Sequence, residues 1–586
     1  MLGGYFILKR FLFCLIVLIL FCVISFKLFY PIYTATELII PYGFTPFDIC
    51  TKNPDLWFII KITYIFTFIF STIILSNFIY LRILLPIFNF FNLKFSHKKS
   101  TIVYNKINDS HFSNLNKDSL TLVVGFDKSN KRHISIPESG LYQNFLITGT
   151  IGSGKTSSSM YPFTRQLLEF NSKNISSKIG MLILDVKGNF YSQVSKYCEN
   201  FNLNNDLIII NIDSNVYYNP LHKPNLKPQV LANRLKTILL LFSENNSESF
   251  WLDKAEQVIT ECIKICRLYN DNYVTFTEIH KLVTLPSYLK ENLAVLKDMF
   301  LSSKFNSKQL YDFNISLDFF QKEFENLDSR TKGIIISEIT RITGVFVSDY
   351  SVSKTFCSDK SVLTFSGFEE VIKSGKIVVL NMNISEYSDL SKIIATYLKL
   401  DFQSEILTFL SNNITKTTAF ICDEFDKFVT KKDAEFFSMS REAKCINIVS
   451  TQSYSSLKST LKDDSDVKVI IQNLINKIWY RTDDIFTIEE AQKQLGKEEK
   501  ERLSTSFSEN AKETRFSYLS NTLNSNDSSI SETFSKYTQN DFIFETNFFT
   551  QELETFTALT FLSDGNKVFK PQKLLMFPYF KDFISY

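Results

Sequence analysis

The most informative segment of the sequence is Gly149-Thr-Ile-Gly-Ser-Gly-Lys155-Thr156. It fits the pattern Gly-x-x-x-x-Gly-Lys-[Ser/Thr], the Walker A motif, at every fixed position. An apolar run from Leu141 to Thr148 precedes it and reads as a buried strand. Glycines let such a loop wrap closely round phosphates and point backbone N–H groups at them. A chance match in an unrelated loop is the alternative, and the preceding strand disfavours it. The sequence therefore predicts a nucleotide-binding α/β domain.

The chemistry expected at this loop is the binding of ATP and Mg²⁺. Lys155 brings a positive charge to the β- and γ-phosphates, and Thr156 offers a hydroxyl to Mg²⁺. The helix that follows presents its N-terminus to the anion. The predicted nucleotide ligands are the loop residues together with one downstream acid: Gly149, Thr150, Ile151, Gly152, Ser153, Gly154, Lys155, Thr156, Ser157 and Asp185.

A second motif lies far downstream, where the apolar run Thr418–Cys422 ends in Asp423 and Glu424. This is the pattern of a Walker B strand. We expect Asp423 to hold Mg²⁺ together with Thr156, and Glu424 to act as the general base that polarises the attacking water. Two solvated acids at a strand end are the alternative. The pairing with a phosphate loop favours the catalytic interpretation.

Two further segments are candidates for the same site. One apolar run ends at Asp185 and another at Gln452, and ligands gather at the carboxyl ends of parallel strands. Gln452 could sense the γ-phosphate or orient water, or it could simply cap a turn. Arg441 lies on a predicted helix, residues 435–444, and could act as an arginine finger on a neighbouring subunit. A solvated surface arginine is equally consistent with the sequence.

Two long apolar runs near the N-terminus predict a membrane anchor. Residues 11–30 and 62–81 are long enough to cross a bilayer. Basic residues flank both outer ends, so the positive-inside rule places both termini in the cytoplasm and the short loop 34–56 outside. The first run also resembles a cleaved signal peptide, but no small-x-small cleavage site follows it.

The rest of the sequence limits the function classes. Net charge is only +3, so the chain is no polycation, and any nucleic-acid surface must be a local patch. The nine cysteines form no Cys-x-x-Cys pair, and the five histidines are dispersed, which leaves no basis for a zinc site or a disulfide framework. Cys262 and Cys266 are expected to be small buried hydrophobic residues.

The spacing of the motifs predicts the domain organisation. More residues separate Lys155 from Asp423 than a bare nucleotide-binding core needs, and residues 228–347 show helical periodicity. We therefore expect an α/β, RecA-like P-loop NTPase core with an inserted all-α domain and an N-terminal two-helix transmembrane anchor. The predicted divisions are the anchor 1–92, a first nucleotide-binding part 93–227, the insertion 228–347, and a second nucleotide-binding part 348–586, whose polar Ser/Asn-rich segment 504–540 is expected to form loops.

Several short elements, in this order, resemble the type IV secretion coupling proteins, the TraG/TraD-like conjugation ATPases. Asp185-Val-Lys187-Gly188 is similar to that family's Asp-Pro-Lys-Gly-Glu element, with Asn189 in place of the glutamate. The other matching elements are Asn219-Pro-Leu221, Phe250-Trp251 with Ala255, Asp423-Glu424-Phe425, and the segment from Ser440-Arg441-Glu442 to Thr451-Gln452-Ser453.

The resemblance implies a hexameric ring at the bacterial cytoplasmic (inner) membrane. Such motors use ATP to pass a relaxase–DNA complex, effector proteins or both to the type IV secretion channel, and the all-α domain is implied in substrate recognition. Two alternatives stay open from the residues. One is a membrane-tethered DNA translocase of the chromosome-partitioning type, which a C-terminal winged domain would favour. The other is a non-hydrolysing substrate receptor, which the intact Walker motifs disfavour.

Overall fold

The computed structural model describes residues 120–580, except 186, 213, 243–248, 303–305, 383, 510–513, 518–521 and 526–529, and scattered positions between 55 and 70. The chain divides into two compact units, Met1–Asn116 and Lys117–Tyr586. The predicted transmembrane helices, residues 11–30 and 62–81, lie outside the described residues apart from a few positions of the second. Among the helices that are described, none is both long and apolar enough to cross a bilayer.

An eleven-stranded sheet forms the centre of the second unit, in the order β2-β1-β15-β14-β9-β3-β8-β7-β4-β6-β5. Its strands are β1 (Thr121–Asp127), β2 (Arg132–Pro137), β3 (Phe145–Thr148), β4 (Gly180–Leu184), β5 (Leu207–Ile210), β6 (Ile377–Leu380), β7 (Thr418–Cys422), β8 (Cys445–Thr451), β9 (Asn476–Trp479), β14 (Thr557–Phe561) and β15 (Gln572–Leu575). The seven strands from β9 to β5 are parallel. The four strands on the other side of β9 pair antiparallel.

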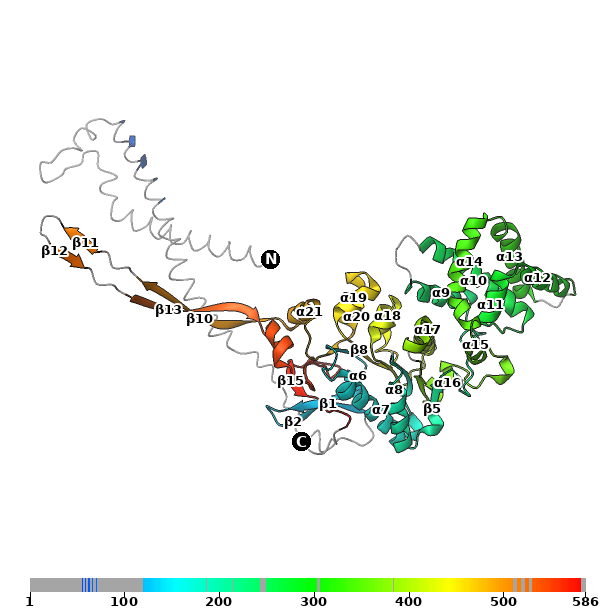
Figure 1. Ribbon diagram of the computed structural model, residues 1–586, viewed down its shortest axis with the longest axis horizontal. Coiled ribbons are helices and arrows are strands. Elements are labelled where there is room, and N and C mark those ends of the chain that lie inside the picture. Colours follow the sequence, from blue (N-terminus) through cyan, green and yellow to red (C-terminus); the bar gives the residue numbers. More distant parts are fainter. Residues whose placement is uncertain are drawn as a thin grey trace. The chain divides into compact units, whose positions relative to one another are not determined.

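Burial on both faces explains why the parallel strands are continuous apolar runs. Every residue of β4 is buried, and successive side chains alternate between two cores. Met181 and Ile183 join the core under α7 (Tyr161–Lys173) and α8 (Phe190–Asn200). Leu182 and Leu184 join the core on the opposite face. Figure 1 shows α7 and α8 on one side of the strands and the yellow helices on the other.

The helices of that opposite face follow β6, β7, β8 and β9 along the chain. They are α17 (Ile384–Ser411), α18 (Lys432–Met439), α19 (Tyr454–Leu461), α20 (Asp464–Asn473) and α21 (Ile485–Leu495). Two shorter helices are α6 (Glu138–Leu141), before β3, and α16 (Phe368–Ser374), before β6. The core under α17–α20 continues without a break into the helices that lie between β5 and β6.

The described part of residues 228–347 is mainly helical, as the periodicity predicted. Figure 1 shows these helices in green as one group. They are α9 (Pro228–Leu239), α10 (Ser249–Tyr269), α11 (Phe276–Thr284), α12 (Pro286–Leu301), α13 (Ser307–Asp318) and α14 (Ser329–Val347), followed by α15 (Tyr350–Phe356). Cys262 and Cys266 on α10 are fully buried in this core, as expected of small hydrophobic residues.

The polar segment 504–540 differs from the expectation of loops. β10 (Lys497–Glu509) pairs antiparallel with β13 (Ile530–Phe542), and a short pair, β11 (Thr514–Ser517) and β12 (Thr522–Ser525), lies between them. Cross-strand pairing satisfies the backbone groups without a hydrophobic core, so the polar composition was a poor guide. An ion pair of 2.6 Å between Arg502 and Asp541 links the base of the ribbon.

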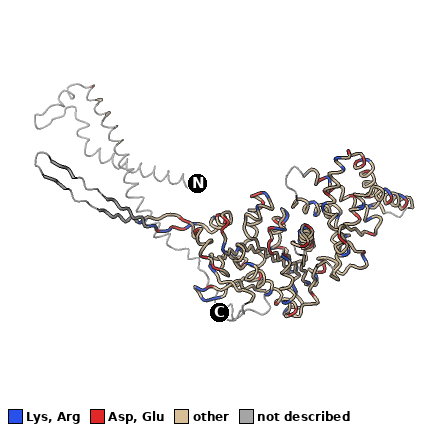
Figure 2. Tube along the Cα trace, in the orientation of Figure 1, with Lys and Arg blue, Asp and Glu red and all other residues tan. Residues whose placement is uncertain are grey.

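Charged residues are spread over the described part of the second unit. Figure 2 shows acidic and basic positions interspersed along the trace, without a long stretch of one sign. This distribution agrees with the small net charge of the chain. The distribution of charge therefore does not locate a functional site, whereas the sequence motifs do.

Candidate nucleotide-binding site

The predicted phosphate loop joins β3 to a single π-helical turn, η2 (Thr156–Met160), which continues into α7. Two glycines of the loop have positive φ, +78° at Gly152 and +104° at Gly154, a conformation that side chains with a Cβ rarely adopt. Gly149 is required for a different reason, because a Cβ there would lie 2.5 Å from the Cβ of Tyr480. The glycine pattern thus reflects the tight path of the backbone.

Lys155 is buried and folds back over the loop. Its ammonium donates to the carbonyl of Gly149 and, at 3.2 Å, to the carbonyl of Thr150. Burial lowers the pKa of Lys155, while the nearby charge of Asp423 acts in the opposite direction. A partly desolvated ammonium inside a loop of backbone N–H groups is suited to a phosphate anion.

Thr156 and Asp423 bring the two motifs together. The Thr156 hydroxyl donates to Oδ2 of Asp423 at 2.6 Å. The other carboxylate oxygen, Oδ1, accepts from the Ser450 hydroxyl and, at 3.1 Å, from the Glu424 N–H. Ser450 lies on β8, the strand between β3 and β7 in the sheet. The Walker B carboxylate is therefore fixed by the turn after the phosphate loop, by β8 and by the residue that follows it after β7.

This oxygen pair fits a Mg²⁺ site. Magnesium prefers oxygen ligands and is commonly bound by one or two protein groups, phosphate oxygens and water. Thr156 and Asp423 offer a hydroxyl and a carboxylate side by side, beside the phosphate loop. Within the described residues no group of three or more His, Cys, Asp or Glu side chains offers another metal site.

Glu424 follows Asp423 in an unusual backbone conformation, with φ +52°. Left-handed conformations of non-glycine residues occur disproportionately at functional sites. Its carboxylate forms an ion pair of 2.8 Å with the ammonium of Lys187, whose side chain is 56% exposed. Partial burial opposes protonation of Lys187, but its bond with Glu424 and the neighbouring acids outweigh it and raise the pKa of the lysine. The predicted base is thus held by a cation from the loop after β4.

Asp185 lies at the same edge of the sheet, at the end of β4, but its oxygens are engaged by the backbone. They accept N–H groups from Lys187 at 3.0 Å, Asn189 at 2.9 Å and Phe190 at 3.1 Å. Burial raises the pKa of Asp185, and so does the charge of Asp423. Its visible role is to shape the loop that carries Lys187 and to start α8.

Gln452 lies beside the phosphate loop, directly after β8, the strand next to β3 in the sheet. It lines a cavity of about 530 Å³ together with Thr150, Ile151 and Asp483. Ile151 is 78% exposed at the tip of the loop. Ser153 and Ser157 hold the loop from within, because their hydroxyls donate to the carbonyls of Thr150 and Gly154. The shared cavity brings Gln452 next to the phosphate loop.

Arg441 does not lie at the site of its own chain. The helix predicted over residues 435–444 ends at Met439 in α18, and Arg441 follows it in a turn before β8, so that expectation was wrong at its C-terminal end. The seven residues of β8, about 3.3 Å each, separate this turn from Gln452. Arg441 is exposed, and its guanidinium donates to the carbonyl of Gly565 at 3.2 Å.

Three contributors escaped the sequence interpretation because they are tertiary contacts. Ser450 binds Asp423, and Lys187 binds Glu424. The buried Tyr480 hydroxyl lies 2.8 Å from the hydroxyl of Ser158 and 2.6 Å from that of Ser159, which fixes the turn after the loop. Lys187 was noted within its motif, but nothing local pointed to its partner.

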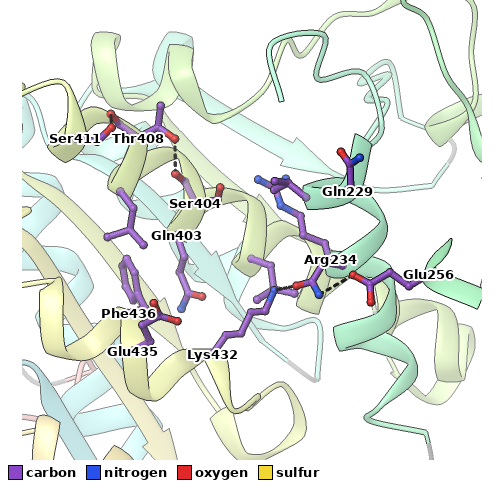
Figure 3. Close-up of a pocket in the computed structure, with 14 residues that line it drawn as sticks. Gln229, Arg234, Glu256, Gln403, Ser404, Thr408, Ser411, Lys432, Glu435 and Phe436 are labelled. Carbon is purple, nitrogen blue, oxygen red and sulfur yellow. Dashed lines mark hydrogen bonds between the residues drawn. The ribbon is translucent and has the colours of Figure 1, made fainter. Parts of the chain in front are cut away.

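A separate cavity of about 610 Å³ lies away from these motifs, between α9, α10, α17 and α18. Figure 3 shows Arg234 and Glu256 facing Gln403 and Lys432 across it. Behind it, Arg234 is paired with the buried Asp401 at 2.7 Å. The cavity therefore marks a polar junction between the inserted helices and the sheet domain and contains none of the predicted site residues.

Comparisons with known proteins agree with this arrangement. Residues 129–330 match the family model of the type IV secretion-system coupling protein DNA-binding domain. Residues 417–539 match the model described as the TraM recognition site of TraD and TraG. The first match contains the phosphate loop and Asp185, and the second contains Asp423, Glu424 and Gln452. A search of the curated proteins found no match.

Solved structures of a conjugative coupling protein share the fold. The unbound monoclinic form of TrwBdeltaN70 has a TM-score of 0.51 at 13% identity and covers 78% of this chain and 88% of that chain. TrwB in complex with the ATP analogue ADPNP has the same TM-score and sequence identity, and the match covers 78% of this chain and 94% of that chain. TrwB in complex with ADP and Mg²⁺ has a TM-score of 0.50 at 12% identity and covers 76% and 87%. The two family models match successive parts of the chain, each with part of the site, and together they support the type IV secretion-system coupling proteins as its family.

Proposed function

We propose that this chain is a membrane-anchored coupling ATPase that delivers DNA with its bound proteins to a type IV secretion channel. The observation that carries the proposal is the 2.6 Å bond between Thr156 and Asp423, which assembles a Walker site from the two segments that match coupling-protein models. ATP and Mg²⁺ are its cofactors. The bound nucleotides of the TrwB structures support this assignment.

The roles of the site residues follow from their positions. Lys155 neutralises charge on the β- and γ-phosphates, and the loop N–H groups hold the phosphate oxygens. When bound, Mg²⁺ supplies positive charge that stabilises the reacting phosphate oxygens. Thr156 and Asp423 would hold it, and Ser450 orients Asp423. Glu424 accepts a proton from the attacking water, while Gln452, beside the loop, orients that water.

DNA is the favoured cargo. One matched model is described as a DNA-binding domain and the other as a recognition site for TraM, which together support a relaxase–DNA complex as the substrate. Effector proteins are the alternative cargo. A DNA translocase of the chromosome-partitioning type and a receptor that does not hydrolyse ATP remain the competing functions, and neither gains support from the family matches.

Membrane attachment and ring assembly complete the proposal. Residues 11–30 and 62–81 supply the inner-membrane anchor, with both termini in the cytoplasm. Arg441 lies at the sheet edge opposite its own site, so it can act as a finger only on a neighbouring subunit. A hexameric ring that contacts the secretion channel would bring each Arg441 to the next subunit.

The test is ATP hydrolysis by the full-length chain in detergent, with and without single- and double-stranded DNA. The coupling function predicts Mg²⁺-dependent hydrolysis that rises several-fold with DNA and disappears in Lys155→Ala. Hydrolysis in an oligomeric preparation that ignores DNA would shift the cargo to effector proteins. Hydrolysis stimulated only by double-stranded DNA would favour the chromosome-partitioning alternative, and an intact protein without hydrolysis would favour the receptor.

A further inference from the structure

The last described residues of the chain lie against the phosphate loop. The Tyr579 N–H donates to the Ser157 carbonyl at 2.8 Å, and the Phe556 N–H donates to the Ser153 carbonyl at 3.2 Å. A third bond of 2.8 Å, from the Met576 N–H to the Phe556 carbonyl, joins the two attached segments to each other. Residues remote in sequence from the Walker motifs thus form one side of the loop.

Aromatic rings continue these contacts round η2. The centroids of neighbouring rings are separated by 4.8, 5.2, 5.4 and 5.8 Å along the series Phe190, Tyr161, Tyr579, Phe580 and Phe556. Phe190 is buried, whereas Tyr579 is 40% exposed and Phe580 is 59% exposed. The series therefore starts in the core, passes through the two exposed rings of Tyr579 and Phe580, and ends at Phe556 beside the phosphate loop.

Backbone strain marks this contact as specific. Phe556 has φ +63°, a conformation that bulky side chains rarely adopt. A Cβ on Gly154 would lie 2.7 Å from the Phe556 ring, so the ring can rest on the loop only because residue 154 is glycine. Such strain persists where the surrounding structure enforces it, and it clusters at ligand sites.

The direction of the nucleotide places its base at these rings. Lys155, Glu424 and Gln452 mark the end of the site where the γ-phosphate reacts. The loop N–H groups hold the α- and β-phosphates. The chain beyond Thr156 therefore faces the α-phosphate, from which the ribose and base extend. Ser157 is the next residue, and its carbonyl is the one that Tyr579 binds.

We propose that Tyr579 and Phe580 form the wall on which the base of the bound nucleoside triphosphate stacks, a role that rests on the proposed nucleotide-binding function. Phe556 supports the phosphate loop from behind. Aromatic stacking accepts any base with little discrimination. The wall therefore strengthens the binding of nucleotides over base-free phosphates and does not select adenine over guanine.

The test compares two ligands on the full-length chain in detergent by isothermal titration calorimetry, in the presence of Mg²⁺. ATP carries the base, and inorganic tripolyphosphate lacks it. Phe580→Ala should weaken ATP binding about tenfold, from the loss of one stacking contact, and leave tripolyphosphate binding unchanged. Phe580→Trp keeps an aromatic ring at this position and should bind ATP about as tightly as the wild type. Phe300→Ala, at an exposed phenylalanine on α12, is the matched control.

Two results would overturn the base wall while leaving the nucleotide site in place. One is unchanged ATP binding by Phe580→Ala. The other is an equal weakening of ATP and tripolyphosphate binding by Phe580→Ala, which would mean that Phe580 only supports the phosphate loop. A wild-type chain that binds neither ligand would instead contradict the proposed function itself. Lys155→Ala is the reference for that outcome, because removing the lysine should weaken the binding of both ATP and tripolyphosphate.

Discussion

The ammonium of Lys187 lies 2.8 Å from a carboxylate oxygen of Glu424, and this pair connects the loop after β4 to the end of β7. Glu424 is buried and has a left-handed backbone conformation, and the Lys187 ammonium neutralises its charge there. More than half of the Lys187 side chain is exposed, so a change in the conformation of its loop can move the ammonium away from Glu424. The position of the predicted base therefore depends on a residue outside both Walker motifs.

Lys187→Met should lower kcat about tenfold with little change in KM, because a misplaced catalytic group loses orientation while the phosphate loop still binds ATP. Steady-state ATP hydrolysis at saturating Mg²⁺ measures the effect. Lys187→Arg should recover most of the rate, since it restores the cation. Unchanged or faster hydrolysis by Lys187→Met would show that the pair does not position Glu424.

Ser450→Ala should raise the Mg²⁺ concentration needed for half-maximal hydrolysis several-fold. The serine hydroxyl holds Oδ1 of Asp423, and loss of an outer contact commonly weakens metal binding. The measurement is a Mg²⁺ titration of hydrolysis at fixed ATP. Ser459→Ala, at an exposed serine on α19, is the control. An unaltered Mg²⁺ requirement would mean that Thr156 and Glu424 suffice to orient Asp423.

Lys477 makes stability depend on pH. Burial in β9 lowers the pKa of Lys477 to about 7, whereas an unfolded lysine titrates at about 10.4. Between these two pH values the unfolded chain binds more protons than the folded chain. The free energy of unfolding therefore rises with pH over this range, and the contribution of Lys477 is lost as the pH falls to about 7.

Lys477→Met should accordingly unfold at a higher temperature than the wild type at pH 6.5, and the difference should shrink towards pH 10. Thermal unfolding of both proteins across this range tests the prediction. The control is Lys468→Met, at an exposed lysine on α20, which should shift little at any pH. A difference that stays constant with pH would contradict the assigned titration.

Arg441 can be tested in mixed rings. If it acts on the neighbouring site, Arg441→Ala and Lys155→Ala subunits are each inactive alone. Mixed rings contain interfaces that combine an intact phosphate loop with an intact Arg441, so part of the hydrolysis should return. Mixing Lys155→Ala with wild type provides the dilution reference. Inactivity at every mixing ratio would assign Arg441 to its bond with Gly565 instead.

The sequence predicted those parts of the fold that local patterns encode. The phosphate loop needs its glycines because the backbone turns sharply there, and the buried parallel strands are continuous apolar runs, so both could be read directly. The helices within residues 228–347 followed from the 3.6-residue period of their apolar positions. Ser450, Lys187 and the aromatic rings of residues 579–580 reach the site only through tertiary packing.

The antiparallel part of the sheet shows the same limit. β15 follows β14 along the chain and pairs with it and with β1 from the start of the described unit. A pairing between segments so distant along the chain has no local sequence signal. The ribbon of β10 and β13 was missed for the opposite reason, because its polar composition predicts loops although its strands pair with each other.

ATP binding and turnover, measured on one preparation of Glu424→Gln beside the wild type, test the role of Glu424 in hydrolysis. The variant should bind Mg²⁺–ATP like the wild type, since Lys155, Thr156 and Asp423 are intact. Its turnover should fall by about 10²- to 10⁴-fold, because the carboxylate that accepts the proton is gone. Turnover within a few-fold of the wild type would contradict the assignment of Glu424 as the base of a coupling ATPase.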